Sequence, residues 1–363
     1  MRLSISIILI FISFNLLAQN KRVYTTERIS IEPKIDGILN DDAWQKGNWE
    51  GDFIQREPVD GVPATQQTFF KVFFTDNYIY IAVKAMDTHA DSIDSRLVRR
   101  DNEEGDLIGV HFDSYFDLRT TFSFMVNAAG VKSDILFSNN GMSRDINWNP
   151  IWYVKTSIDA EGWYAEIKIP LSQLRFSKTD NKVWGFNLAR YIYRSEELSF
   201  WNPIPRTASG FVYDYGELHG IADLKPKRII EIAPYVSLGL ETSEKEDGNP
   251  YRTGSEMLYG AGLDGKIGIT NDFVLDFTFN PDFGQVEADP SEMNLTAFET
   301  YQQEQRPFFI EGSNILDFKV NPGDHDQDNL FYSRRVGRVP QYYPDLATNE
   351  YMNYPMVTKI LEH

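Results

Sequence analysis

Residues 105–134, GDLIGVHFDSYFDLRTTFSFMVNAAGVKSD, alternate apolar and polar side chains with a period of two. Successive side chains of a β-strand point to opposite faces, so this pattern predicts consecutive antiparallel strands. A turn at Asn127–Gly130 would lead into a third strand that ends near Phe137. The stretch therefore predicts a sheet with one apolar face. The apolar positions of its first two strands are Ile108, Val110, Phe112, Phe122, Phe124 and Val126.

The same alternation recurs on both sides of this stretch. Turn residues at 75–77 and 159–162 separate further alternating segments, which predicts two β-hairpins. Aromatic residues make up 14% of the chain, a composition that favours strands. We expect residues 21–224 to form an all-β, jelly-roll-like sandwich. Three tryptophans lie at positions typical of its core, namely Trp44, Trp163 and Trp184.

The N-terminus has the pattern of a secretory signal peptide. Residues 1–20, MRLSISIILIFISFNLLAQN, combine one basic residue, an apolar run and the small residue Ala18. We expect residues 1–18 to be removed and the protein to be exported through the inner membrane. Its destination would then be the outer membrane, the periplasm or the cell surface. The chain has no cysteine, which excludes disulfides and a lipid-modified cysteine.

The chain carries a formal net charge of -18. A nucleic-acid backbone is therefore excluded as a partner, because like charges repel. Such acidity suits an exported, soluble protein or the attraction of divalent cations.

After residue 226 the alternating segments become longer. Residues 230–241 alternate over about a dozen positions, whereas strands of soluble proteins usually have about five or six residues. Transmembrane β-strands of about ten residues show this pattern, and a second soluble sandwich is the alternative. We predict that residues 226–318 resemble an incomplete outer-membrane β-barrel of long amphipathic antiparallel strands. Residues 319–363 are expected to form an irregular tail.

Several segments resemble the family 9 carbohydrate-binding module over residues 25–224. They are IDGILNDDAW, VFFTDNYIYIAVKAMD, GDLIGVHFD and EGWYAEIKIPLSQL. The resemblance implies a jelly-roll sandwich that binds sugars and commonly holds structural Ca²⁺. Residues 228–340, including FTFNPDFGQVEADPSEMNLTAFETYQQEQRPFFIEG and FYSRRVGR, are similar to an uncharacterised domain of bacterial outer-membrane proteins.

The resemblance also implies where a sugar would bind. Family members hold the sugar between two tryptophans, one of them in the loop before residues 106–113. Here that loop reads RRDNEEG and has no aromatic residue, while Tyr213 is placed to substitute for the second tryptophan. Trp201 could stack on a pyranose ring, with Asn202 bonding a hydroxyl, or it could instead plug one end of the sandwich. The candidate sugar-binding residues are Trp201, Asn202, Tyr213, Arg99, Arg100 and Glu104, and the candidate calcium ligands are Asp106 and Asp113.

No catalytic constellation is evident in the sequence. Residues 260–265, GAGLDG, match a dinucleotide-binding motif only in spacing, because no helix follows them. We therefore expect no nucleotide cofactor and no catalytic residue. The leading hypothesis is a carbohydrate-binding protein of the cell envelope that serves polysaccharide capture or catabolism. The alternatives are an outer-membrane structural or transport protein with a sandwich appendage, a glycoside-hydrolase-associated enzyme, and a haem-binding sandwich that uses His89 or His111.

Overall fold

The computed structural model describes most of the residues between 21 and 280 and a few later ones. The described ranges are 21–176, 182–224, 230–242, 244–245, 247–250, 254–269, 273–280, 304, 307–310 and 331–336. The predicted signal peptide and the predicted tail beyond residue 336 lie outside them. Within these ranges the protein is all-β, as predicted. No described helix is long and apolar enough to cross a bilayer.

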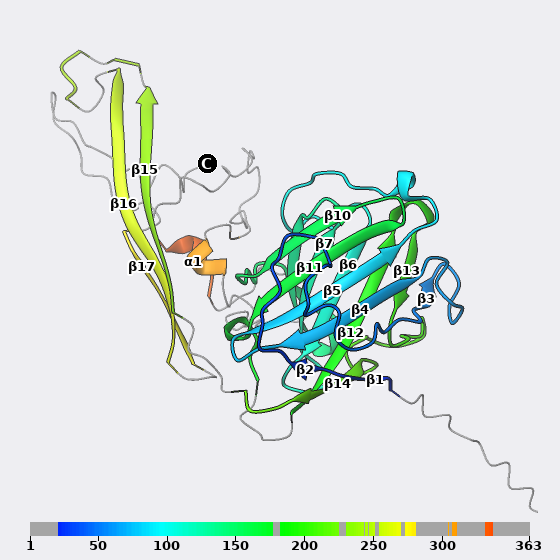
Figure 1. Ribbon diagram of the computed structural model, residues 1–363. Helices are drawn as coiled ribbons and strands as arrows, with labels where there is room; N and C mark the ends of the chain where they lie inside the picture. Colours follow the sequence, from blue (N-terminus) through cyan, green and yellow to red (C-terminus); the bar gives the residue numbers. More distant parts are fainter. Residues whose placement is uncertain are drawn as a thin grey trace, which may run out of the picture.

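The first sheet of the sandwich has nine strands (Figure 1). Its order is β1–β14–β12–β6–β7–β8–β9, with β13 paired to β12 and β3 paired to β13. The predicted meander is confirmed as β6, β7 and β8, and Gly130 takes a φ of 83° in the turn between the last two. The strands are β1 (Val23–Thr25), β3 (Ile54–Glu57), β6 (Leu107–Asp113), β7 (Thr121–Asn127), β8 (Lys132–Ser138), β9 (Ser143–Asp145), β12 (Lys182–Ile192), β13 (Glu197–Phe200) and β14 (Gly216–Ile221).

The second sheet has five strands in the order β10–β11–β5–β4–β2. Both predicted hairpins are confirmed, as the antiparallel pairs β4–β5 and β10–β11. The N-terminal segment joins the layers, because β1 pairs with β14 of the first sheet and β2 with β4 of the second. The strands are β2 (Glu27–Arg28), β4 (Thr68–Phe74), β5 (Tyr78–Met86), β10 (Tyr153–Ile158) and β11 (Gly162–Pro170).

Single helical turns lie between strands of the sandwich and after β17. They are the 3-10 turns η1 (Ala90–Ser92), η2 (Asn139–Gly141), η3 (Leu171–Gln173), η4 (Tyr193–Ser195) and η6 (Ser333–Arg335), and the α-helical turn α1 (Pro307–Ile310).

The main core lies between the inner faces of the two sheets. Trp163 and Trp184 are buried in it, and Trp44 is buried in a second cluster on the outer face of the five-stranded sheet. All three tryptophans are therefore core residues, as predicted. Glu166 of β11 is also buried there, and its Oε1 accepts a hydrogen bond from the Trp44 indole at 2.7 Å. This bond ties the segment before β3 to the sheet.

The prediction that the sheet around β6 has one apolar face is corrected, because apolar side chains pack against both of its faces. Ile204, Val212 and Tyr215 pack over the outer face of the first sheet. His111, on that face of β6, is only 7% exposed, and its Nδ1 lies 2.7 Å from the Ser123 Oγ. Burial lowers the pKa of His111 to about 4, so the imidazole is neutral at pH 7. The segment that returns to cover this face lies some ninety residues later in sequence, which no local pattern could reveal.

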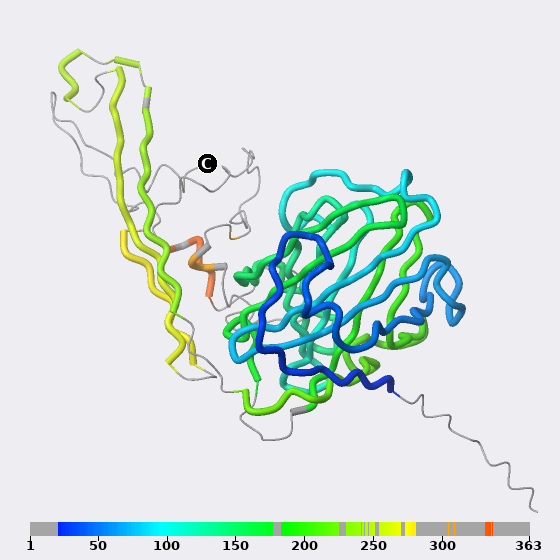
Figure 2. Tube along the Cα trace, in the orientation of Figure 1, coloured from blue at the N-terminus to red at the C-terminus, as the bar shows by residue number. Residues whose placement is uncertain are grey.

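A third sheet follows the sandwich in the chain (Figure 2). It contains β15 (Ile230–Thr242), β16 (Ser255–Gly268) and β17 (Val274–Phe279), paired antiparallel in that order. The first two strands have 13 and 14 residues, as the long alternating segments predicted. Their apolar side chains are largely exposed, with Val236 82%, Leu238 83% and Tyr259 85% accessible. The polar positions occupy the other face.

Candidate functional site

Trp201 and Asn202 lie in the interior of the sandwich. The Trp201 side chain is fully buried, and its indole Nε1 donates to the Glu50 Oε1 at 3.3 Å. The Asn202 amide is also committed, since its Oδ1 accepts from the Arg22 backbone N at 2.8 Å and its Nδ2 donates to the Asp214 carbonyl at 2.6 Å. The prediction of a Trp201 sugar platform is therefore corrected, because a buried ring has no face to offer a ligand.

Arg99, Arg100 and Tyr213 were also predicted to contact the sugar, and the structure places them in different surroundings. Arg100 turns toward the first sheet, where its Nη2 donates to the buried Asp134 Oδ1 at 2.7 Å. Arg99 is exposed on the same loop. Tyr213 is 60% exposed, with the Lys21 ammonium 5.3 Å from its ring centroid. Tyr213 thus stays available as an exposed ring, whereas Arg100 is held by an ion pair.

The two predicted calcium ligands lie at opposite ends of β6, roughly 20 Å apart at the usual rise per residue. Asp113 accepts hydrogen bonds from the backbone N of Asp117 at 3.1 Å and of Leu118 at 2.7 Å, and burial raises its pKa to about 6. Asp106 accepts from the Asp94 backbone N at 2.6 Å. They cannot share one ion, and the described residues contain no group of three His, Cys, Asp or Glu side chains placed to hold a metal. Calcium binding stays a prediction.

Asp106 belongs to a buried cluster of charges. The Arg190 side chain is fully buried; its Nη2 lies 3.6 Å from the Asp87 Oδ2 and its Nη1 donates to the Gln67 carbonyl at 3.0 Å. Arg194 donates to the Asp87 Oδ1 at 2.8 Å. Burial lowers the pKa of Arg190 to about 10, opposed by the charges of Asp87 and Asp106. The cluster links β12 to the loop that leads into β6.

An exposed tyrosine surface lies where this loop meets the end of β12. Tyr193, in η4, is 40% exposed, and its ring makes an edge-on contact with Tyr191 at a centroid distance of 6.4 Å and 81°. The Arg96 guanidinium lies 4.7 Å from the Tyr193 ring centroid. Arg96 is held by Asp94, with its Nε 2.9 Å from the Asp94 Oδ1, and its Nη1 lies 3.8 Å from the Glu104 Oε2. We call Tyr191, Tyr193, Arg96 and Glu104 the Tyr193 surface.

The Tyr193 surface combines an aromatic ring with an exposed guanidinium and an exposed carboxylate. An aromatic face packs on apolar C–H groups, and planar charged groups bond hydroxyls at fixed angles. Glu104 was predicted as a sugar contact, and the structure brings it to this surface. Sequence reasoning missed Tyr193, although the YIYRSEE segment, which places two tyrosines at the end of a predicted strand, carried a signal.

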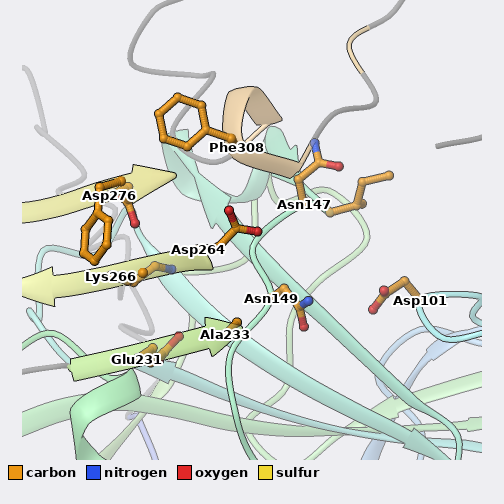
Figure 3. Close-up of a pocket in the computed structure, with 12 residues that line it drawn as sticks. Asp101, Asn147, Asn149, Glu231, Ala233, Asp264, Lys266, Asp276 and Phe308 are labelled. Carbon is orange, nitrogen blue, oxygen red and sulfur yellow. The ribbon is translucent and has the colours of Figure 1, made fainter. Parts of the chain in front are cut away.

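A pocket of about 470 Å³ lies between residues 146–149 and the polar face of the third sheet (Figure 3). Glu231, Lys266 and Asp276 are directly opposite one another across the three strands. Charges of alternating sign therefore cross the sheet. Gln173 of the sandwich donates to the Glu231 Oε1 at 2.9 Å. The polar face of the sheet is thus the one that meets the sandwich.

Two family models match the chain, each over less than half of its length. Residues 35–197 match the carbohydrate family 9 binding domain-like model, and residues 226–363 match a domain of unknown function, DUF5916. The chain therefore contains a family-9-like carbohydrate-binding-module domain followed by a DUF5916 match. The resemblance predicted for the first domain is confirmed. No curated protein matches the chain.

The chain is also similar to several solved structures. A family 9 carbohydrate-binding module from Caldicellulosiruptor kristjanssonii in complex with glucose is 18% identical, with a TM-score of 0.42 over 57% of this chain and 97% of that one. The cellotriose complex of such a module from the same organism is also 18% identical, with a TM-score of 0.40 over 57% and 95%. A proposed carbohydrate-binding protein from Bacteroides uniformis is 13% identical, with a TM-score of 0.45 over 55% and 99%.

Proposed function

We propose that this protein binds carbohydrate through the sandwich and contributes to polysaccharide capture at the cell envelope. The family 9 match over residues 35–197 carries the proposal, because it covers the described strands that support the Tyr193 surface. The proposal includes no catalytic step. Export is supported by the apolar, signal-like segment at residues 1–20.

The Tyr193 surface has the chemistry that a neutral sugar needs. A pyranose has C–H groups that pack on an aromatic ring and hydroxyls that need both donors and acceptors. Tyr193 supplies the ring, Arg96 supplies donors and Glu104 supplies an acceptor. The Asp94 carboxylate lowers the number of conformations open to Arg96, since it bonds the guanidinium at two nitrogens. A held donor loses less entropy when a ligand binds.

Replacement of Tyr193 by alanine is expected to weaken polysaccharide binding by about tenfold or more, the size of effect typical of a central aromatic contact. The measurement is affinity electrophoresis of the full chain through gels that contain a panel of neutral soluble polysaccharides. Glu104→Gln should weaken binding less, because the amide keeps one acceptor oxygen.

Tyr213→Ala is the matched control, because Tyr213 is an exposed tyrosine outside the Tyr193 surface. Its mobility in each gel should equal that of the unchanged protein. Retardation that survives Tyr193→Ala and disappears in Tyr213→Ala would place the site at Tyr213 instead. If no polysaccharide in the panel slows the protein, the proposed function fails.

The third sheet supports a second candidate function, that of an outer-membrane protein with the sandwich as an appendage. The observation is the row of exposed apolar side chains on unusually long strands. Its members on β15 are Ile230, Ile232, Val236, Leu238 and Leu240, each at least 61% exposed.

This candidate predicts that the full chain floats with phospholipid vesicles in a density gradient. Leu238→Asp should reduce the floated fraction, because a charged side chain on the lipid-facing side of a strand is unfavourable. The cost is about 2 to 4 kcal/mol for Arg or Lys near the bilayer midplane and smaller for an acidic residue. Ser237→Asp, which changes the neighbouring residue on the opposite face, is the control. Recovery of the unchanged protein in the vesicle-free fraction would rule out lipid contact.

A further inference from the structure

A pocket of about 480 Å³ lies on the five-stranded sheet and contains no residue of the Tyr193 surface. It is bordered by β10, β11, the start of β5, Lys132 of β8 and residues 33–35. Its size is within the range of small-ligand pockets. The lining residues that matter are Lys34, Tyr78, Lys132, Tyr153, Lys155 and Lys168, and we call this set the lysine pocket.

Four of these residues are lysines, in a chain whose net charge is -18. Lys34 pairs with Asp36 at 2.9 Å, and Lys168 pairs with Glu32 at 3.0 Å. Lys132 and Lys155 have no carboxylate within 4 Å in the described part of the chain. The pocket therefore has positive charge in excess of its local carboxylates.

Lys132 is the more enclosed of the two unpaired lysines. Its Nζ donates to the Trp152 carbonyl at 2.6 Å, which fixes the ammonium beside the first residues of β10. Burial lowers its pKa, as does the nearby charge of Arg100. An anion that enters the pocket would offset both the burial of the Lys132 ammonium and its repulsion from Arg100.

Lys155 lies opposite Glu166, a carboxylate whose two oxygens both accept hydrogen bonds from other groups. The two residues are partners in the β10–β11 register. The Glu166 Oε2 accepts from the backbone N of Asp36 at 2.9 Å and of Gly37 at 2.6 Å, and its Oε1 accepts from Trp44. The ordinary cross-strand ion pair is thus replaced by bonds to the segment before β3. Lys155 is left exposed, with its charge available to a ligand.

Tyr153 adds an aromatic ring at the same place. It precedes Lys155 by two residues, so both side chains lie on one face of β10. Tyr153 is 50% exposed and has no ring stacking or side-chain hydrogen bond among the described residues. Its cross-strand partner Lys168 places its ammonium 3.9 Å from the Tyr78 ring centroid instead. The Tyr153 ring is therefore open to a ligand.

We propose that the lysine pocket binds the carboxylate of a uronic-acid residue in an acidic oligosaccharide. Lys155 and Lys132 pair with the carboxylate, and Tyr153 packs against the C–H groups of the pyranose ring. This second site deepens the carbohydrate-binding function and rests on it only for the class of ligand. A small inorganic anion would use the lysines but would leave Tyr153 and the apolar side chain of Ile35 unused.

The test is isothermal titration of the full chain with a purified tetragalacturonate and with its methyl ester. The ester has the same rings without the charges, so we expect it to bind about tenfold more weakly. Lys155→Gln should weaken binding of the free acid by about threefold to fivefold, as expected for an accessible ion pair. Tyr153→Ala should weaken binding of both ligands, because it removes the stacking contact.

Lys245→Gln is the matched control, since it removes the same charge from an exposed lysine outside the pocket. Its affinity should stay within about twofold of the unchanged protein. The proposal is overturned if the protein does not bind tetragalacturonate, or if it binds the acid and the ester equally. It is also overturned if Lys155→Gln and Lys245→Gln have equal effects, or if inorganic phosphate at equal concentration displaces the oligosaccharide. Tyr193→Ala separates it from the proposed function: loss of neutral-glycan binding with retained uronate binding shows two sites.

Discussion

Arg190→Met is expected to lower the free energy of unfolding by about 3 to 5 kcal/mol at pH 7. The side chains of Arg190 and Asp87 are both fully buried, and the substitution removes the charge while leaving the carboxylate in place. Asp106, also fully buried, loses the same attraction. A buried carboxylate without its partner is costly because water can no longer solvate it. Urea denaturation followed by tryptophan fluorescence gives the value.

The pH dependence separates this charge effect from lost packing. Burial alone would raise the pKa of Asp87, but its bonds to Arg194 and the His89 backbone N, with the charge of Arg190, hold it below the ordinary value. The stability that this provides is present above the unfolded-state pKa and is lost as the pH falls through the folded-state pKa. The deficit of Arg190→Met should therefore be largest at pH 7 and shrink below about pH 4.

Arg194→Met is the control, because the Arg194 side chain is 29% exposed and water can partly replace its bond to Asp87. Its loss of stability should be clearly smaller. Equal losses for the two arginine variants would contradict the account of the buried cluster. So would an Arg190→Met deficit that is as large at about pH 3 as at pH 7.

Trp201→Ala is also expected to cost about 3 to 5 kcal/mol, the usual range for removal of a buried tryptophan. Its ring packs between Phe70 and Phe186, with centroid distances of 5.5 and 5.8 Å. The substitution leaves a cavity and an unpaired Glu50 acceptor. Thermal or urea denaturation at pH 7 measures the loss.

Trp201→Phe distinguishes a core role from a binding role. This variant keeps an aromatic ring at position 201, so its free energy of unfolding should lie between that of the Trp201→Ala variant and that of the unchanged protein. Glycan binding by the folded Trp201→Phe protein should equal that of the unchanged protein. A variant that keeps its stability and loses glycan binding would mean that Trp201 contacts the sugar after all.

Much of the sandwich could be predicted from the sequence because it depends on local patterns. The period-two alternation of 105–134 identified β6, β7 and β8, and short polar turns at 75–77 and 159–162 identified both hairpins. Positions in such strands also identified Trp44, Trp163 and Trp184 as core. Each of these predictions uses residues within one or two neighbouring strands.

The candidate sites depend on contacts between distant residues, which local sequence patterns do not reveal. Trp201 follows a strand and precedes Asn-Pro, a pattern that favours a loop side chain open to a ligand. In the structure its ring instead contacts Glu50 and Phe70 in the interior. Glu104 and Tyr193 both lie beside Arg96 only because the loop after η1 folds onto the end of β12. The lysine pocket likewise joins Lys132 to β10 and β11. Pairing between such distant segments is set by the tertiary fold.

The most direct test of carbohydrate binding at the Tyr193 surface is hydrogen–deuterium exchange of the full chain with and without a saturating neutral glycan. A bound sugar should slow amide exchange in residues 94–104 and 191–196, which carry the Tyr193 surface. Exchange in residues 211–214 around Tyr213 should not change. Protection confined to residues 211–214, or unchanged exchange in residues 94–104 and 191–196 at saturation, would contradict the proposed site.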